Sequence, residues 1–326
     1  MDWQIIDRPG DLGPVPMQQH CHYGRACAGI GARVIRLAAG RPGDPVGTAQ
    51  VLVRRWPLLG DFALIARGPA WAPGVPLDEA RRGTADLVRR LRRDCRGVMI
   101  ASDPVEGQDP VAGLLPMVTG GCQARLALGP AEEMMARQHG KWRNRLRRGQ
   151  DGPLRVDHAP LPEEADHWLL LREETQSKRR NYRRLPRSFT YAWRVLNGAK
   201  STRLFVARYG REPVAAMLFL LHGRGASYHL GWSDELGRQT HAHTLLMWEA
   251  ACWLAARGHA WADLGLLDTE TAPGLARFKL GSGAVPVRLG ATCLDAPGTG
   301  AVARLFGVRS GDPEPANAAG VGMVLR

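Results

Sequence analysis

The chain of 326 residues lacks the features that mark membrane, secreted and metal-binding proteins. No apolar run reaches the roughly 18 residues of a membrane span, and the acidic N-terminal residues do not resemble a signal peptide. The cysteines form no C-x-x-C pair, and the spacing of His20, Cys21, His22 and Cys27 matches no familiar zinc site. No P-loop, Rossmann fingerprint or Ser-His-Asp order is present. We therefore expect a cytoplasmic protein with reduced thiols, no metal and no bound cofactor.

Lysine is also scarce, because only four of the 44 basic residues are lysines. The net charge of +13 and a pI near 10.2 indicate affinity for polyanions such as tRNA, phosphorylated substrates or an anionic membrane surface. An arginine-rich composition inherited from a GC-biased genome would give the same charge without a function, and the sequence leaves both interpretations open. The hydrophobic content of 44% is that of a folded protein, and the length suits two domains.

The two halves of the chain show the same order of predicted elements. Each half gives a strand or helix, then three strands, a helix and a further strand. In the first half these elements cover 4–7, 17–28, 32–38, 48–55, 62–67, 77–95 and 97–102. In the second half they cover 163–178, 203–208, 213–222, 225–232, 244–257 and 261–265, followed by a helical segment at 274–281. We therefore expect two α/β domains, at 1–150 and 151–295, and a Gly/Ala/Pro-rich tail at 296–326.

A basic helix is predicted at the joint between the halves, over 131–148, with Gly149 as its C-cap. Its acidic residues stand in the first turn and its arginines in the last, as the helix dipole favours. Lys141, Arg145 and Arg148 fall near one face, where they could follow a phosphate backbone. A solvated charge run would have the same pattern.

Two short motifs near the end of the second half carry polar residues that suit chemistry. Pro273-Gly-Leu-Ala-Arg-Phe-Lys279 places a lysine within a glycine-flanked helical segment, and a fixed cation stabilises a developing oxyanion. Asp263-Leu-Gly265 ends a predicted strand, where an acid points into the crevice of an α/β sheet or caps the next helix.

These motifs resemble those of the FemAB-like (FemABX) aminoacyltransferase branch of the GNAT acyltransferase superfamily. The segment Lys141-Trp-Arg-Asn-Arg-Leu-Arg-Arg148 and Arg67-Gly-Pro69 also match family patterns. The resemblance implies an α/β fold of two tandem GNAT-like (acyl-CoA N-acyltransferase fold) domains, each a mixed sheet flanked by helices. It implies transfer of an aminoacyl group from aminoacyl-tRNA to an amine on a small molecule, a peptide or a lipid.

The resemblance also implies roles for particular residues. Lys279 would stabilise the oxyanion with help from the Phe278 backbone, and Asp263 would orient the incoming amine or the lysine. Phosphate contacts would come from the basic helix, and the acceptor cleft would be lined by residues at the end of a strand and in the loop that follows it. The predicted binding residues are Lys141, Arg143, Arg145, Arg148, Arg238, Trp232 and His229. Trp232 would equally suit a protein core.

Two other functions stay open at this point. A GNAT enzyme that uses acyl-CoA or an acyl carrier has the same fold, but such enzymes wrap the CoA pyrophosphate with glycine amides at a helix start. The corresponding segment here, Arg238–His243, contains no glycine. The chain could also be a non-catalytic GNAT-like module that binds RNA or polyphosphate through its basic surface.

Overall fold

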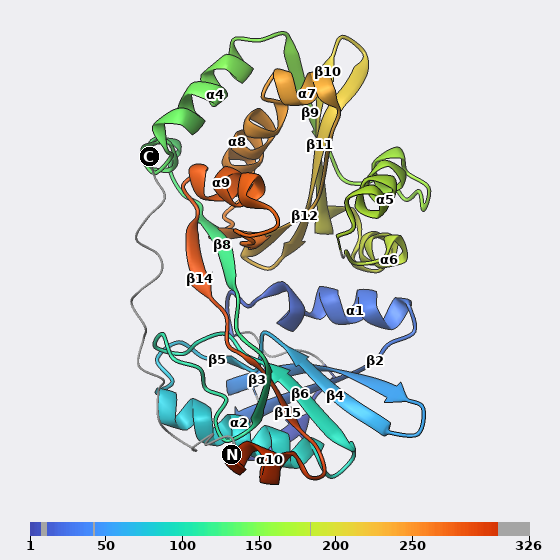
Figure 1. Cartoon of the computed structure of the whole chain (residues 1–326), viewed down its shortest axis with the longest axis vertical. Coiled ribbons are helices and arrows are strands. Elements are labelled where there is room, and N and C mark those ends of the chain that lie inside the picture. The colour runs from blue at the N-terminus through green and yellow to red at the C-terminus, as the bar shows by residue number, and fades with distance from the viewer. Residues whose placement is uncertain (8–11, 42, 183, 306–326) are drawn as a thin grey trace.

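The computed structural model describes residues 1–7, 12–41, 43–182 and 184–305. It contains two mixed sheets, each flanked by helices (Figure 1). All six cysteines are unpaired. Among the described residues no helix is both long enough and apolar enough to cross a membrane.

The first domain contains a sheet in the order β1-β2-β3-β4-β6-β15-β7, with the short β5 added to β3. Its strands are β1 (Trp3–Ile5), β2 (Arg33–Arg41), β3 (Asp44–Trp56), β4 (Gly60–Ala66), β5 (Ala70–Trp71), β6 (Gly97–Ala101), β7 (Leu115–Val118) and β15 (Thr292–Asp295). Its helices are η1 (Met17–Gln19), α1 (Cys21–Gly29), α2 (Leu77–Leu91) and α10 (Thr299–Leu305). Alternate residues of β3, among them Val51 and Val53, pack against Leu87 and Leu91 of α2, as two amphipathic elements require.

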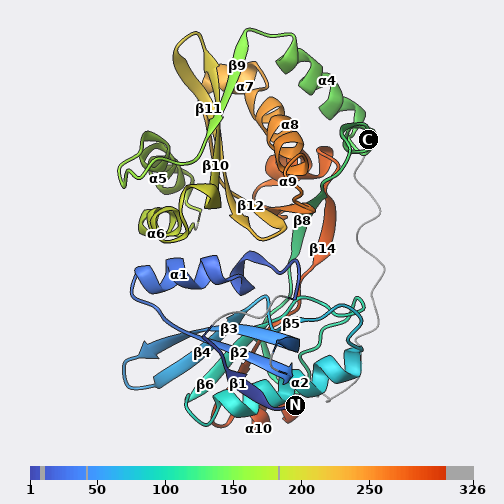
Figure 2. The ribbon, with the colours of Figure 1, turned by 180° about the vertical axis from the view of Figure 1, so that it is seen from behind.

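The second domain contains a sheet in the order β14-β8-β13-β12-β11-β10-β9. Its strands are β8 (Cys122–Ala127), β9 (Leu154–Ala159), β10 (Thr202–Tyr209), β11 (Glu212–His222), β12 (Gly225–Ser233), β13 (Trp261–Leu266) and β14 (Val285–Arg288). Its helices are α3 (Ala131–Ala136), α4 (Gly140–Gln150), α5 (Trp168–Arg180), α6 (Arg187–Asn197), η2 (Ala199–Ser201), α7 (Glu235–Gln239), α8 (Ala242–Ala255) and α9 (Pro273–Gly281). Helices α8 and α9 cover one face of this sheet, and α5 and α6 cover the other (Figures 1 and 2).

The two sheets are built alike, as the order of predicted elements indicates. In each, four antiparallel-paired strands are followed by a helix and a fifth, parallel strand, so that β4 pairs with β6 and β12 with β13. The outer two strands are then exchanged along the chain, because β7 and β15 lie in the first sheet while β8 and β14 lie in the second. The sequence placed the division at residue 150, whereas the chain changes sheet between Val118 and Cys122 and returns between Arg288 and Thr292. These strands are too short for their pattern of apolar residues to show which sheet each one joins.

The C-terminal segment differs from the expected division. Thr292–Asp295, expected in the second domain, is an inner strand of the first sheet, and Thr299–Leu305, expected in the tail, forms α10 next to β7. Positions 306–326 of the expected tail lie outside the described residues.

The domains are joined by apolar packing. Helix α1 lies between the two sheets and packs on α6 (Figures 1 and 2). Ala26 and Cys27 of α1 are buried with Phe189 and Trp193 of α6 and with Leu220 of β11. Because this cluster draws on both domains, it fixes one domain against the other. The sequence did not predict α6.

The basic helix predicted over 131–148 is two helices, α3 and α4. The chain is extended at His139, whose amide nitrogen donates to the carbonyl of Gly281 at the end of α9, 3.1 Å away. This tertiary bond interrupts the helix. Gly149 is not the C-cap; it lies inside α4 and faces Leu245 and the carbonyl of His241 at the start of α8, where an added Cβ would make ordinary contacts.

Candidate functional site

The second sheet opens between two of its central strands. β12 and β13 pair only over 225–227 and 261–263, although β12 continues to Ser233 and β13 to Leu266. Beyond the paired residues the strands diverge, and their facing backbone groups need other partners. In the first sheet β4 and β6 stay paired over 62–66, up to the end of β4. We call the space between the diverging ends of β12 and β13 the notch.

Lys279 reaches the β13 side of the notch from α9. Its Nζ donates to the carbonyl oxygen of Leu266 at 2.8 Å, and it lies 3.5 Å from where a Cβ on Gly265 would stand. The side chain is buried, and desolvation lowers the pKa of Lys279 to about 8. No carboxylate in the described part of the chain forms an ion pair with it. A buried ammonium held only by a carbonyl dipole is suited to stabilise an anion that develops beside it.

The helix that carries Lys279 is seated by aromatic packing. The Phe278 ring lies 6.3 Å from the ring centroids of both Trp142 and His243. Gly281 ends α9 against Trp142, whose ring atom would stand 2.7 Å from an added Cβ, so a larger residue would displace the helix. The Phe278 amide lies inside α9, where it is used by the helix, so Phe278 contributes packing rather than an oxyanion donor.

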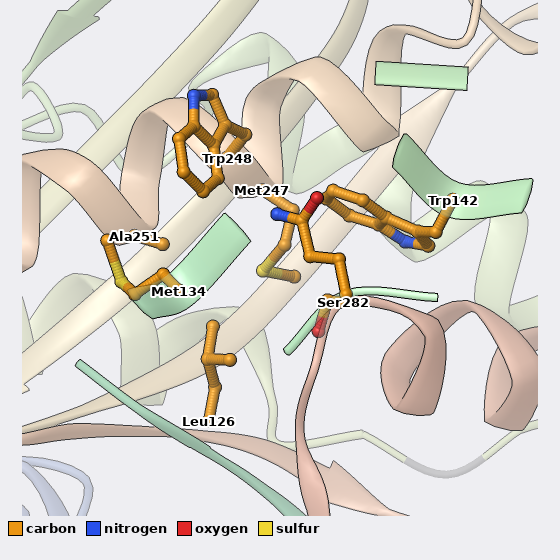
Figure 3. A pocket seen from close by; sticks show the side chains of 8 residues that line it. Leu126, Met134, Trp142, Met247, Trp248, Ala251 and Ser282 are labelled. Atoms are coloured by element: carbon orange, nitrogen blue, oxygen red, sulfur yellow. The ribbon is translucent and has the colours of Figure 1, made fainter. Parts of the chain in front are cut away.

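A small void lies among side chains of β8, α3, α4 and α8, with Ser282 after α9 at its edge (Figure 3). Its volume of about 10 Å³ is that of one water molecule. Gln138 and Trp142 both line the void, and Gln138 Oε1 and Trp142 Nε1 are buried without a hydrogen-bond partner in the described structure. The void is too small for a substrate.

Three residues outside the predicted set contact the part of β12 that lies beyond its pairing with β13. Gln176 of α5 donates to the Gly231 carbonyl at 3.2 Å, and His243 Nε2 lies 3.0 Å from the Trp232 carbonyl. That nitrogen must donate, so the imidazole is the Nε2–H form, and burial lowers the pKa of His243. The Tyr228 hydroxyl covers Gly231 so closely that an added Cβ would stand 1.8 Å from it. No periodic signal in the sequence marks these residues.

Asp263 is an interdomain anchor rather than a free acid. Its Oδ2 accepts from Arg67 Nη1 at 2.9 Å and its Oδ1 from Arg125 Nε at 3.1 Å. Arg67 comes from the first domain, and it also binds Asp103 with two hydrogen bonds and Gln123 with one. Both carboxylate oxygens are therefore engaged by guanidinium groups. The expected roles of Asp263, orienting the amine or capping a helix, do not fit this geometry.

Trp232 and His229 face away from Lys279, toward the helices on the opposite side of the sheet. Trp232 packs on Trp168 of α5 and lies under the guanidinium of Arg172, 4.4 Å from its ring centroid. His229 Nε2 is 2.7 Å from the Thr190 hydroxyl of α6, and burial lowers its pKa to about 4. These positions suit core packing, and the structure does not bring either residue together with Lys279.

The cations of α4 lie on the surface. Lys141, Arg145 and Arg148 are exposed and share one helix face, and Arg143 is half-buried. None of the four forms an ion pair with a carboxylate among the residues described. Arg145 and Arg148 lie close enough to His241, at the start of α8, to add to the effect of burial in lowering its pKa. The structure thus brings the α4 cations to the start of α8.

Arg238 lies on α7, just before α8. Its guanidinium donates to the Ser233 carbonyl at 2.9 Å and to Glu235 at 2.6 Å, and almost half of its side chain is exposed. His241, at the N-cap of α8, has a left-handed backbone with φ of 58°. In an acyl-CoA enzyme a glycine-containing loop at the start of this helix would wrap the pyrophosphate. Here side chains and helix α4 surround the start of α8.

The His20, Cys21 and His22 side chains offer ligand atoms that lie within 4.8 Å of one another. Two of these side chains have structural roles: His20 Nδ1 accepts from the His22 amide and caps α1, and His22 Nδ1 lies 3.0 Å from the Leu221 carbonyl. The His20 ring also packs near the buried His222, 5.9 Å between centroids. We assign this group to the domain interface, and the absence of a metal remains a prediction.

An open hollow of about 390 Å³ lies between α5 and α6. Arg184, Arg187 and Tyr191 line it, and Arg184 is also paired with the buried Glu173 at 3.2 Å. Because α5 and α6 cover the opposite face of the sheet from α9 (Figure 1), this hollow does not include Lys279.

Comparison with known proteins agrees with this geometry. Residues 136–280 match the family model of an acetyltransferase (GNAT) domain. No curated protein sequence matches the chain. The structure of FemX superposes with a TM-score of 0.71 at 13% identity, covering 94% of this chain and 100% of FemX. The structure of L-PGS from Bacillus licheniformis superposes with a TM-score of 0.54 at 12% identity, covering 91% of this chain and 94% of the other.

These comparisons confirm the expected fold of two GNAT-like domains and the expected acyltransferase domain. The matched segment begins at residue 136 and includes α4, the notch and Lys279. At such low identities the superposed structures give the fold alone.

The low pKa of Lys279 predicts a pH-dependent stability. In the unfolded chain the lysine keeps its proton up to a pKa of 10.5, whereas in the folded protein it loses it near pH 8. The unfolded chain therefore binds more protons between these values, so this contribution to stability rises with pH, by roughly 3 kcal/mol in all. Urea unfolding of the unaltered protein and of Lys279→Met at pH 7.5 and pH 10 measures it. Lys279→Met should lack this rise and be no less stable at pH 7.5; parallel pH dependences would mean that the amine titrates normally.

Proposed function

We propose that this acyltransferase, built from two GNAT-like domains, transfers an aminoacyl group from aminoacyl-tRNA to an amine. The single observation that carries the proposal is Lys279, a buried amine that has no anionic partner among the described residues, at the edge of the notch. The resemblance of the sequence motifs to the FemAB-like branch implies an acceptor amine on a small molecule, a peptide or a lipid. Because charged tRNA is a cytoplasmic donor, the proposal places the reaction in the cytoplasm.

In the proposed reaction the acceptor nitrogen attacks the carbonyl carbon of the aminoacyl ester. The carbonyl oxygen then gains negative charge, which the Lys279 ammonium stabilises at the rim of the notch. The intermediate collapses with cleavage of the bond between the carbonyl carbon and the terminal ribose oxygen of the tRNA. The proton lost by the nitrogen passes to that oxygen, directly or through water. We assign no protein base to this transfer, because Asp263 is bound to two arginines.

The basic face of α4 supports a nucleic-acid donor. Its five cations, Lys141, Arg143, Arg145, Arg147 and Arg148, have no acidic partners in the described structure, and an unpaired row of cations favours a phosphate backbone over a neutral ligand. The α4 helix also packs on α8, so a nucleic-acid strand bound along α4 would run toward the start of α8.

A second candidate is acyl-CoA as donor, because the matched family model is an acetyltransferase domain. The start of α8 argues against it: the segment contains no glycine, and α4 packs against the carbonyls of Thr240 and His241. CoA would have to find its pyrophosphate contacts elsewhere.

Replacing Lys279 by methionine should lower kcat by about 10²–10³ with little change in KM, because an oxyanion partner acts only in the transition state. Arginine should rescue poorly, since its planar group is larger and directs its charge differently. Initial rates of amide formation from charged tRNA measure the effect. Lys200→Met, at an exposed lysine, is the matched control. Near-normal turnover in Lys279→Met would refute the assignment.

Calorimetry with CoA and acetyl-CoA tests the donor. We expect no binding tighter than about 100 μM, or roughly 5.5 kcal/mol, because the start of α8 lacks open backbone. Tighter binding would replace tRNA by acyl-CoA as the donor.

Substitution of Arg143, Arg145 and Arg148 by alanine should weaken tRNA binding and flatten its salt dependence. Removing three phosphate contacts should lower the slope of log affinity against log salt by about 2 to 3. Fluorescence anisotropy across a salt series measures the slope. The control removes the same charge from the first domain, at the exposed Arg82, Arg89 and Arg93. Equal slopes in both triple variants would show that α4 is only a solvated face.

A further inference from the structure

The turn between β3 and β4 presents two leucines to solvent. Leu58 is 106% exposed and Leu59 is 56% exposed, the largest values for two adjacent apolar residues among those described. The turn is held from behind, because Trp56 stacks on the buried Phe62 with ring centroids 4.6 Å apart. The leucines therefore stand on a fixed base and contribute nothing to the core. We call Trp56–Gly60 the tip.

The backbone of the tip is strained at the most exposed residue. Leu58 has a φ of 66°, in the left-handed region that glycine and asparagine adopt more readily. A bulky leucine in this conformation costs stability and packs on nothing. Strain of this kind, at a residue without a structural role, points to a function for its side chain.

Cations surround the base of the tip. Arg54 and Arg55 precede it on opposite faces of β3, and Arg96 lies beside Gly60. These three arginines form no ion pair in the described structure, whereas the nearby Asp61 is paired with Arg33. The leucines lie in the turn beyond the last strand pair, Trp56 with Gly60, and Arg55 lies one pair further back. Apolar side chains at a projecting turn with arginines behind them suit the acyl boundary of a bilayer with its headgroups above.

Further exposed apolar residues lie on the same side of the molecule. The β3–β4 turn and the C-terminal end of α1 are both at the right of Figure 1 and at the left of Figure 2. Ile30 follows α1 and is 40% exposed, and Leu196 of α6, 48% exposed, packs on Gly29 beside it. The side that carries the tip thus adds apolar contacts from both domains.

We propose that the tip docks the protein on an anionic phospholipid bilayer, with Leu58 and Leu59 inserted at the interface and Arg54, Arg55 and Arg96 on lipid phosphates. A bilayer fits better than a protein partner, because the apolar group is a narrow projection ringed by cations rather than a broad flat patch. The docking goes beyond the proposed transfer reaction and does not depend on it. It would bring the enzyme to acceptors held at a membrane surface.

Co-sedimentation with vesicles tests the docking. The full chain should bind phosphatidylcholine vesicles that contain about 30% phosphatidylglycerol, should bind pure phosphatidylcholine weakly, and should be released by salt. The variant Leu58→Asn with Leu59→Asn should partition at least about tenfold less. Asparagine suits a positive φ, so this variant should fold and should transfer normally to a soluble amine. The variant Arg54→Gln with Arg55→Gln should lose most of the preference for phosphatidylglycerol.

The matched control changes Met117 and Val118 to asparagine. These residues are 53% and 59% exposed on β7, at the far edge of the same sheet, and the control should bind vesicles normally. Absence of vesicle binding by the unaltered protein, or full binding by the Leu58→Asn and Leu59→Asn variant, would overturn the proposal. Self-association that this variant abolishes, without vesicle binding, would assign the tip to a second copy of the chain.

Discussion

The buried ion pairs of Asp263 join the two domains at the strand on which the candidate site depends. Arg67 of the first domain and Arg125 of β8 each bind one oxygen of this carboxylate, and Arg67 is held in turn by Asp103. Each charge has lost most of its water, so removal of one partner would leave the others buried and unpaired. The pairing fixes β13 against the first domain, and Leu266, which receives the Lys279 amine, lies three residues further along the same strand. The position of the amine is therefore tied to the packing of both domains.

The notch and its lysine are costly features of an otherwise well-paired structure. Divergence of β12 and β13 gives up sheet hydrogen bonds, and side chains such as Gln176 and Lys279 bind some of the carbonyls near the gap. Burial without a carboxylate lowers the pKa of Lys279 to about 8, so the folded protein holds the charged amine at a cost. In the described part of the first sheet the equivalent strands stay paired to the end of β4, without such a gap. Two similar domains thus differ at the candidate site.

Unpaired surface cations are found in both domains. The α4 cations and the arginines around the tip belong to different domains, and neither set is neutralised by acids in the described structure. The net charge of +13 is therefore concentrated partly in two places that suit two different anionic surfaces. A long-range attraction to polyanions would act on both, whereas short-range contacts would distinguish a tRNA backbone from a bilayer.

The sequence by itself determined the class of the fold and the repeated order of elements, and its motif singled out Lys279 as a candidate. Apolar runs such as Pro213–His222 predict buried strands, because neighbouring residues alone carry the pattern. The Phe278-Lys279 motif is likewise contiguous in the chain. Tertiary structure alone decided the exchange of β7, β8, β14 and β15, the break at His139 and the neutralisation of Asp263. It also turned His229 and Trp232 away from Lys279, since the bulge where β11 meets β12 resets which face each side chain takes. These outcomes depend on partners more than one hundred residues away or on strand register, neither of which a local pattern contains.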